Sequence, residues 1–461
     1  MTSPLEFTDL PLDPALFAGL DALGHVQMTP VQAQSLPALI EGRDVIAQAP
    51  TGSGKTVAFG LGLLHRIDAS RIEVQALVLC PTRELAEQVA RQVRKLATGV
   101  PNLKLLTLTG GVALAPQLAS LDQHAPHVIV GTPGRVQELL RKKALKLRDV
   151  RVLVLDEADR MLDMGFEEQI REIVAATPRT RQTLLFSATF PDAIRAVAQA
   201  TMREPVEVSV EAHVDQPAIE QRFVEVEPAQ KTAALAGALL AHHDGRAVVF
   251  CNMRRDADEV ASSLAHLGFD ALALHGDLEQ RDREEVLVRF ANGSCDVLVA
   301  SDVAARGLDI EDLGLVVNYD VPSDADTYTH RIGRTGRAGR GGVALTLCTG
   351  RERSRLAAIE TALGIEAVLR KPTLAPLRNG VGRHAAMRTL RIDGGRTDKL
   401  RPGDIVGALT GEAGLPATAI GKIDVFPTRS YVAVRREDVA RALSRLQEGR
   451  IKAKRFRVRR L

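Results

Sequence analysis

The stretch VIAQAPTGSGKTVAFGLGLLHR, residues 45–66, joins a short apolar run, a glycine-rich turn and a longer apolar segment. The short run is typical of a buried strand, and the longer segment has the length of a helix. A turn of this kind between a strand and a helix presents backbone N–H groups at the helix N-terminus, where phosphate binds. The stretch therefore predicts an α/β fold with a phosphate-binding loop.

The residue types inside this loop suit a nucleotide. Gly52 and Gly54 let the backbone approach phosphates, Lys55 would neutralise the β- and γ-phosphates of a nucleotide, and Thr56 can hold Mg²⁺. The strict pattern GxxxxGK[ST] fails at its first position, so a plain glycine-rich turn before a helix is the alternative. The expected nucleotide-binding residues of the loop are Ala49, Pro50, Thr51, Gly52, Ser53, Gly54, Lys55 and Thr56.

Strand-like runs and amphipathic helical stretches alternate through two long parts of the chain. The first series is VIAQA, ALVLC, LKLLTLTG, HVIVGT, RVLVLDEAD and QTLLFSAT, and the second is AVVFCN, DALALHG, CDVLVASD, LGLVVNYD and GVALTLC. Such alternation predicts parallel sheets with helices on both faces. A polar stretch near residues 208–219 indicates a hinge, and a Pro- and Gly-rich stretch at 371–385 indicates a second break. We expect domains at 1–208, 218–372 and 386–461.

The composition is that of a globular protein, with 45% apolar and 25% charged residues in 461. No run reaches the roughly 18 apolar residues of a membrane helix, and the start shows no signal-peptide pattern. The four cysteines lie far apart without a CxxC pair, which favours buried thiols in a reducing compartment. We expect a cytoplasmic protein without a membrane partner.

The run VLVLDEAD, residues 152–159, ends a predicted strand on carboxylates. Open α/β sheets bind ligands at the carboxyl ends of their strands. Asp156 would hold Mg²⁺, largely through water, and Glu157 would orient or deprotonate the attacking water. An acidic loop that caps the next helix is the alternative, which the phosphate-binding loop disfavours.

DEAD at 156–159, together with APTGSGKT and SAT at 187–189, resembles the DEAD-box RNA helicase family. Further motifs of that family follow in its order: GHVQMTPVQ, PTREL, GG, TPGR, VVFCN, HGDLEQRDR, SDVAARGLD and HRIGRTGR. The resemblance covers nearly all of residues 1–372. It implies two RecA-like domains in tandem, ATP and Mg²⁺ as cofactors, RNA-stimulated ATP hydrolysis, and local, non-processive unwinding of short RNA duplexes.

The resemblance also assigns roles around the nucleotide. Gln32, within a motif that includes Gln27, would read the adenine edge, and Phe7 would lie against the base. Asp309 would contact the ribose, and Gly307 is a further implied nucleotide-binding residue. The remaining implied role is coupling. Ser187 and Thr189 would hydrogen-bond the DEAD loop and couple the two halves, and His330 would link ATP hydrolysis to RNA. The alternative for the SAT segment is an ordinary turn that ends a strand, and the alternative for His330 is a side chain that is simply packed.

Arg334 and Arg337 in HRIGRTGR match the arginine-finger motif and have no obvious acidic neighbour in the sequence. An arginine finger stabilises the charge that develops during phosphoryl transfer. If these residues lie on the domain opposite the phosphate-binding loop, hydrolysis requires domain closure. Taken alone, the pair would read as a solvated basic loop.

The family motifs further imply contacts to the RNA backbone, which position a strand without reading its sequence. The implied RNA-contact residues of the core are Arg83, Gly111, Thr132, Gly134, Arg135, Gly276, Arg283 and Ser301.

The sequence pattern of residues 386–461 predicts strands and helices in the order β-α-β-β-α-β. This order is the ferredoxin-like fold of an RNA-recognition motif. Tyr431 falls where such a sheet places a stacking aromatic, although the usual aromatic-rich signature is absent. From Pro376 onward the chain has 20 Lys and Arg against 8 Asp and Glu, whereas the rest has 40 against 49. This asymmetry favours nucleic acid as a partner, and a protein-docking module is the alternative.

The closing run RIKAKRFRVRRL, residues 450–461, alternates with period two. We expect a final strand with Phe456 inward and Arg455, Arg457 and Arg459 outward, where the three arginines would contact RNA.

The stretch GDIVGALTGEAGLPATAIGKIDVFPTRSYVAV, residues 403–434, closely resembles the C-terminal domain of a bacterial subgroup of these helicases. This resemblance implies recognition of a 23S ribosomal RNA hairpin in the assembling 50S subunit. An ATP-gated RNA clamp, a general RNA chaperone and a DNA helicase are the alternatives. No heptad repeat indicates dimerisation, so we expect a monomer.

Overall fold

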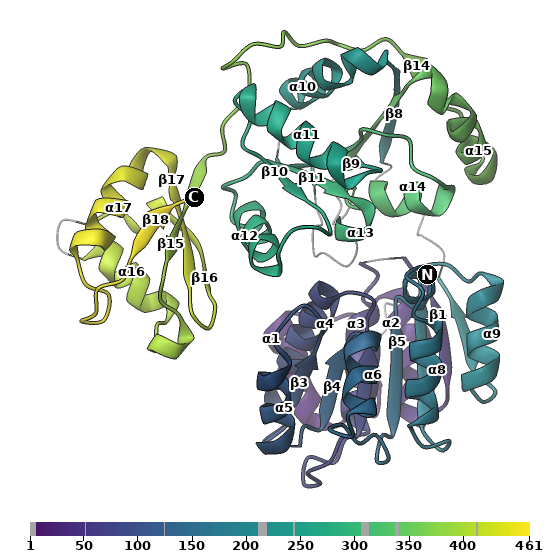
Figure 1. The fold of residues 1–461 in the computed structure, drawn as a ribbon. Helices are drawn as coiled ribbons and strands as arrows, with labels where there is room; N and C mark the ends of the chain where they lie inside the picture. The colour runs from purple at the N-terminus through teal and green to yellow at the C-terminus, as the bar shows by residue number, and fades with distance from the viewer. Residues whose placement is uncertain are drawn as a thin grey trace. The chain divides into compact units, whose positions relative to one another are not determined.

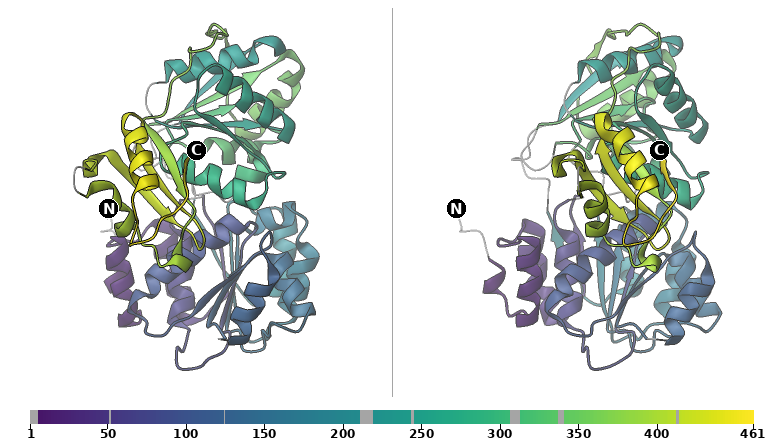
Figure 2. Two further views of the ribbon diagram at one scale, coloured as in Figure 1. Left: turned by 60° about the vertical axis from the view of Figure 1, so that its left-hand side comes forward. Right: turned by 90° about the vertical axis from the view of Figure 1, so that its left-hand side faces the viewer.

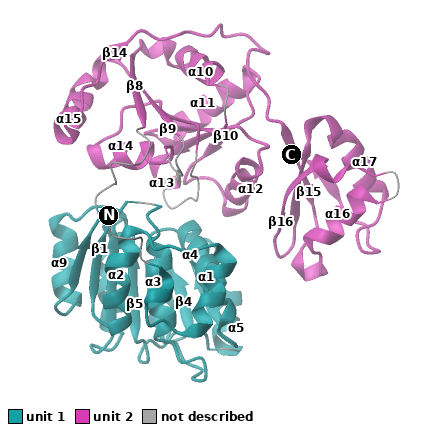
Figure 3. Ribbon diagram, turned by 180° about the vertical axis from the view of Figure 1, so that it is seen from behind, with its two compact units in different colours: residues 1–215, 307–309 teal, residues 216–306, 310–461 magenta. Residues whose placement is uncertain are grey.

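The structure is a computed structural model that describes residues 6–50, 52–123, 125–210, 219–242, 245–305, 313–336, 341–411 and 414–461. The chain forms two compact units, residues 1–215 with 307–309, and residues 216–306 with 310–461 (Figure 3). Four of the expected site residues lie outside the described residues: Thr51, Gly307, Asp309 and Arg337.

A seven-stranded parallel sheet forms the centre of the first unit, in the order β3-β4-β2-β5-β6-β1-β7 (Figure 1). Alternate strand residues enter cores on opposite faces, as Val78 and Leu79 of β2 do. Strands buried on both faces read as continuous apolar runs, which explains the sequence pattern. The strands are β1 (Val45–Gln48), β2 (Ala76–Leu79), β3 (Leu105–Leu108), β4 (Val128–Gly131), β5 (Val152–Asp156), β6 (Gln182–Ser187) and β7 (Val206–Ser209).

Helices cover both faces of this sheet. Helices α1 to α4 contribute to one core, and α6 to α9 contribute to the other. The helices are α1 (Phe17–Leu23), α2 (Pro30–Glu41), α3 (Lys55–His65), α4 (Arg83–Leu96), α5 (Leu114–Gln123), α6 (Pro133–Arg141), α7 (Ala158–Asp163), α8 (Glu167–Ala175) and α9 (Asp192–Thr201).

The second unit repeats the plan with a parallel sheet in the order β10-β11-β9-β12-β13-β8-β14. Its strands are β8 (Glu220–Glu225), β9 (Ala247–Cys251), β10 (Ala271–Leu274), β11 (Val297–Ser301), β12 (Leu315–Asn318), β13 (Val343–Cys348) and β14 (Leu369–Arg370). Its helices are α10 (Lys231–Ala241), α11 (Arg254–His266), α12 (Gln280–Ala291), α13 (Asp302–Ala305), α14 (Ala325–Ile332) and α15 (Arg353–Leu363).

The second unit also carries a smaller antiparallel sheet in the order β16-β17-β15-β18. Its two helices lie on one side of this sheet (Figure 2). The order β-α-β-β-α-β is confirmed, although the last strand is shorter than expected. The elements are β15 (Met387–Ile392), α16 (Pro402–Thr410), β16 (Ile420–Val425), β17 (Ser430–Arg435), α17 (Val439–Glu448) and β18 (Val458–Arg460).

The expected fold class, two parallel-sheet domains in tandem plus a ferredoxin-like domain, is confirmed. Three strands were not expected from the sequence: β7, β8 and β14. Most of their residues are partly or fully exposed, so they lack the apolar runs that marked the other strands. Strand β7 pairs with β1, so the first sheet extends into the stretch where we expected the hinge to begin. The proposed domain limits stay predictions.

All four cysteines are buried free thiols. Burial raises the pKa of Cys295 to about 12, which leaves its thiol protonated and unreactive at neutral pH. Among the helices that the structure describes, none combines the length and apolarity needed to cross a bilayer.

Candidate active site and RNA-contact residues

The phosphate-binding loop lies between the end of β1 and the start of α3. Gly54 caps α3 with a left-handed backbone (φ 92°), and a Cβ at this position would collide with the side chain of Gln32. The Lys55 ammonium is buried and donates to the Ala49 carbonyl at 2.8 Å. The first turn of α3 therefore presents its N–H groups and a lysine at one place, as a polyphosphate requires.

Gln32 supports this loop from the start of α2. Its Nε2 donates to the Gly54 carbonyl at 3.1 Å, and its Oε1 accepts from the Thr29 N–H at 2.8 Å. The Thr29 hydroxyl donates to the Ser53 carbonyl at 2.7 Å. Both ends of the Gln32 carboxamide thus hold protein groups, so in this structure Gln32 orders the loop, while its expected contact with adenine stays a prediction.

Phe7 is 3% exposed and packs in the first core rather than presenting its ring to solvent. The expected stacking of Phe7 on a base therefore does not fit this arrangement. The preceding residue, Glu6, pairs with the exposed Gln27 in an isolated β-bridge, which brings the N-terminal segment to the motif that contains Gln32.

The carboxylates expected at the end of β5 are in place and buried. The pKa of Asp156 is raised to about 7, chiefly by burial and in part by the neighbouring Glu157, against the opposing charge of Lys55. Glu157 has a left-handed backbone (φ 52°), and its carboxylate lies 3.5 Å from the Arg160 guanidinium. A buried carboxyl group that its surroundings compensate so poorly suits a divalent cation, so Asp156 fits Mg²⁺, while the role of Thr56 stays a prediction.

The SAT segment contacts the DEAD loop directly. The Asp159 N–H donates to the Ser187 hydroxyl at 3.3 Å, and the Thr189 N–H and hydroxyl donate to the Asp159 carboxylate at 3.0 and 2.9 Å. Burial opposes ionisation, but these hydrogen bonds and the Arg160 charge hold the pKa of Asp159 below its ordinary value. The hydrogen bonds expected between the two motifs are therefore present.

The implied RNA-contact residues of the first unit lie at helix starts. Arg83 opens α4, and Thr132 caps α6, next to Gly134 and Arg135. The Gly110 N–H donates to the Thr132 hydroxyl at 3.3 Å, and Arg135 donates to the Val112 carbonyl at 3.0 Å. The loop that contains Gly111 and the start of α6 are thus tied together, and helix N-termini suit backbone phosphates.

In the second unit Arg283 on α12 donates to the Ala304 carbonyl in α13 at 2.9 Å. Ser301 ends β11, where its hydroxyl is buried and makes no hydrogen bond to a described residue. Gly276 follows β10, His330 lies in α14, and Arg334 follows α14 with 5% exposure.

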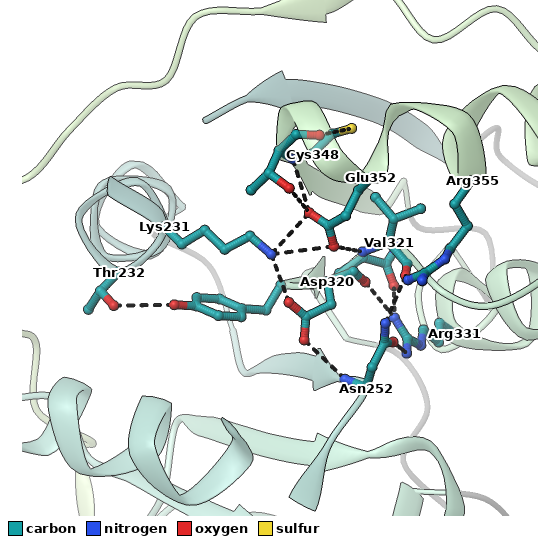
Figure 4. Close-up of polar contacts among 12 residues, drawn as sticks. Lys231, Thr232, Asn252, Asp320, Val321, Arg331, Cys348, Glu352 and Arg355 are labelled. Carbon is teal, nitrogen blue, oxygen red and sulfur yellow. Dashed lines mark hydrogen bonds and ion pairs between the residues drawn. The ribbon is translucent and has the colours of Figure 1, made fainter. Parts of the chain in front are cut away.

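Sequence reasoning gave Arg331 no role, yet it is the centre of a buried polar network (Figure 4). Its guanidinium donates to both carboxylate oxygens of Asp302 (2.6 and 2.7 Å), to Asn252 (2.7 Å), and to the side chain of Asn318 and the carbonyl of Asp320. A charged residue beside two proposed fingers, with apolar neighbours Tyr328 and Ile332 on its helix, was the available sequence signal.

Lys231 on α10 extends this network. Its ammonium lies 2.7 Å from Asp320 and 3.2 Å from Glu352 (Figure 4). Burial alone would lower its pKa, but the two carboxylates hold the pKa of Lys231 above its ordinary value.

The sheet face of the ferredoxin-like domain packs against α12 and the loop after it. The Asn292 side-chain amide donates to the Thr389 hydroxyl at 2.9 Å, and that hydroxyl donates to the Ser294 hydroxyl at 2.8 Å. Arg429 donates to Glu284 at 2.6 Å, and Arg391 lies 3.5 Å from Glu285.

Tyr431 belongs to this covered face. It is fully buried, and its hydroxyl lies 3.4 Å from Glu285. Burial raises the pKa of Tyr431 to about 12. The expected stacking of Tyr431 on an RNA base is therefore wrong for this arrangement.

The three closing arginines are exposed as expected, although only Arg459 of them lies in β18, and their contact with RNA stays a prediction. Val458 is buried and Phe456 is half-buried, while Arg455, Arg457 and Arg459 are exposed. None of the three arginines makes a side-chain ion pair with a residue that the structure describes.

The fold and the site define a P-loop ATPase with two RecA-like domains. Family models match the DEAD/DEAH box helicase domain at residues 29–197, the helicase conserved C-terminal domain at 230–339 and the DbpA RNA binding domain at 389–460. The chain therefore belongs to the DEAD-box ATP-dependent RNA helicases, and its third domain is of the DbpA type.

Two curated relatives show how far the likeness extends. The chain is 51% identical to the ATP-dependent RNA helicase DbpA of Escherichia coli (strain K12), over 97% of both chains. It is 44% identical to the DEAD-box helicase CshA of Bacillus cereus, over 77% of this chain and 67% of the relative.

Among solved structures, S. cerevisiae Dbp5 bound to RNA and ADP BeF3 matches with a TM-score of 0.73 and 33% identity, over 79% of this chain and 95% of that one. Mss116p bound to ssRNA and AMP-PNP matches with a TM-score of 0.72 and 27% identity, over 81% of each chain.

We expect Gln32→Glu to weaken ATP binding about tenfold, since it replaces a buried hydrogen bond to the Gly54 carbonyl with a repelling carboxylate. The Thr29 hydrogen bond survives this change. Titration with a fluorescent ATP analogue measures the affinity, and Gln34→Glu, an exposed change on the same helix, is the control. Equal affinities of the two variants would contradict the role of Gln32.

We expect Asp156 to make wild-type stability fall as the pH rises from about 4 to about 8. Its pKa is raised from 3.8 to about 7, so in this window the native chain holds a proton that the unfolded chain has released. Asp156→Asn removes this pH-dependent contribution to the free energy of unfolding. The stability of the variant relative to wild type should therefore increase with pH. Urea unfolding at several pH values measures it, with the exposed Asp192→Asn as control. Parallel curves for wild type and Asp156→Asn would refute the assignment.

Proposed function

We propose that this RNA helicase uses Mg²⁺–ATP to separate short RNA duplexes locally, and that its third domain directs it to a 23S ribosomal RNA hairpin during assembly of the 50S subunit. The observation that carries this proposal is the identity to DbpA over 97% of both chains, which includes the third domain as well as the ATPase core. The match of the DbpA RNA binding domain at residues 389–460 supports it independently.

The geometry of the first unit supports the chemistry. The start of α3 and Lys55 hold the phosphates, and Mg²⁺, held by Thr56 and Asp156, would supply neutralising charge. Glu157 orients the attacking water and accepts its proton. Because Asp159 bonds to Ser187 and Thr189, a shift of the SAT segment would move the DEAD loop.

The second unit supplies Arg334, and Arg337 by sequence, to stabilise charge on the transferred phosphoryl group. Closure of the two units over ATP and RNA would bring these groups together, so that hydrolysis follows RNA binding. The core contacts on RNA are backbone contacts, which leaves sequence preference to the third domain.

Two features of the third domain bear on where RNA binds. Its sheet face is covered by contacts with α12, Asn292 and Ser294. The row Arg455, Arg457 and Arg459 is exposed and free of described ion pairs. We therefore place an electrostatic RNA contact on this row.

We expect ribosomal RNA that contains the hairpin to stimulate ATP hydrolysis at lower concentration than either the same RNA without the hairpin or an unrelated RNA. Steady-state ATPase assays at fixed salt measure the half-maximal RNA concentration. Changing Arg455, Arg457 and Arg459 to Gln should raise it and flatten the dependence of RNA affinity on salt, by up to about 0.9 per lost phosphate contact. Equal stimulation by the three RNAs would favour a general RNA chaperone and overturn the targeting proposal.

We expect Glu157→Gln to bind ATP and RNA while hydrolysing ATP at least about a hundredfold more slowly, because the water loses its proton acceptor. Single-turnover hydrolysis and RNA binding in the presence of ATP measure the two properties, with the exposed Glu168→Gln as control. A wild-type rate as slow as that of Glu157→Gln would favour an ATP-gated clamp.

A further inference from the structure

The short helix α13 is held at two points by residues from different elements. Its first residue, Asp302, makes a bidentate ion pair with Arg331 of α14 at 2.6 and 2.7 Å. Its third residue, Ala304, accepts a hydrogen bond from Arg283 of α12 at 2.9 Å. Arg283 is an implied RNA contact, and Ser301, another one, directly precedes Asp302. RNA bound by these two residues would therefore act on α13.

Arg331 connects α13 to the proposed finger. The Arg331 carbonyl accepts from the Arg334 N–H at 3.3 Å, so the two residues belong to one turn at the end of α14. The Arg331 guanidinium is 2% exposed and lies 5.3 Å from the centre of the Phe250 ring. Its position therefore sets where the turn that carries Arg334 begins.

The guanidinium also fixes how the strand ends are arranged. It donates to groups that end or follow β9, β11 and β12. The acceptors on Asn252 and Asp320 are labelled in Figure 4, and the others are the side chains of Asp302 and Asn318. A planar guanidinium with donors in fixed directions satisfies these acceptors together, whereas an ammonium cannot. A packed, fully bonded group of this kind shifts as a unit rather than bending gradually.

We propose that the Asp302–Arg331 ion pair is the positioning element through which RNA held at Ser301 and Arg283 sets the place of Arg334 for ATP hydrolysis. This inference rests on the proposed function. Arg331 does not touch the nucleotide in this scheme, and it acts through Arg334.

The test compares Asp302→Asn and Arg331→Lys in the full-length chain, with ATPase rates measured against both ATP and RNA concentration. We expect the RNA-stimulated kcat to fall by about tenfold to a hundredfold, since a displacement of about 1 Å costs up to a hundredfold. The KM for ATP and the half-maximal RNA concentration should stay within about threefold, because neither substrate loses a direct contact. Asp302→Glu, which keeps the charge, should recover part of kcat.

Arg353→Lys and Glu225→Gln are matched controls, since these residues form an exposed ion pair of 2.8 Å in the same unit. Thermal unfolding of each variant identifies loss of fold. The proposal is overturned if folded variants keep the wild-type kcat, if kcat falls only in step with RNA affinity, or if both variants unfold, which would make the pair structural. Failure of RNA to stimulate the wild-type chain would instead refute the proposed function, and no variant is needed to see it.

Discussion

Parallel strands place all of their carboxyl ends at one edge of a sheet, and the sites of this helicase depend on that constraint. In the first unit β1, β5 and β6 end at the phosphate-binding loop, at Asp156 and at Ser187. In the second unit β9, β11 and β12 end beside Asn252, Asp302 and Asp320. Residues that are far apart in the sequence therefore lie close together at one edge, because the strand ends position them and no long loop is needed.

The carboxyl edges of the two parallel sheets differ in how fully their buried charged groups are compensated. At the first edge the buried Asp156 is compensated so incompletely that its pKa rises to about 7. At the second edge the buried Arg331 guanidinium has a bidentate carboxylate and three further acceptors. An uncompensated buried charge is costly unless a ligand arrives, whereas a fully bonded one holds its surroundings in a single arrangement. This contrast distinguishes the Asp156 edge, which suits a bound cation, from the Arg331 network, which suits the positioning of neighbouring residues.

The third domain shows how one fold can serve a different contact. A ferredoxin-like sheet of the RNA-recognition type offers a flat face for bases. Here basic residues of that face meet acidic residues of α12, as Arg429 meets Glu284, and Tyr431 is buried between them. The face thus joins two parts of one compact unit. Exposed arginines remain at Arg457, just before the edge strand β18, and at Arg459 within it.

The sequence alone determined the class of fold, the phosphate-binding loop and the position of two carboxylates at the end of β5, because strand periodicity and strand-to-loop motifs are local properties. It also determined that Arg457 and Arg459 are exposed, because these arginines alternate along the chain with the apolar residues Phe456 and Val458. It missed β7, β8 and β14, whose half-exposed residues carry no apolar run. Only the tertiary structure decided that Gln32 orders the phosphate-binding loop, that Tyr431 is covered and that Arg331 joins three strand ends. The physical reason is that burial and hydrogen-bond partners come from segments distant in the chain, which no local pattern encodes.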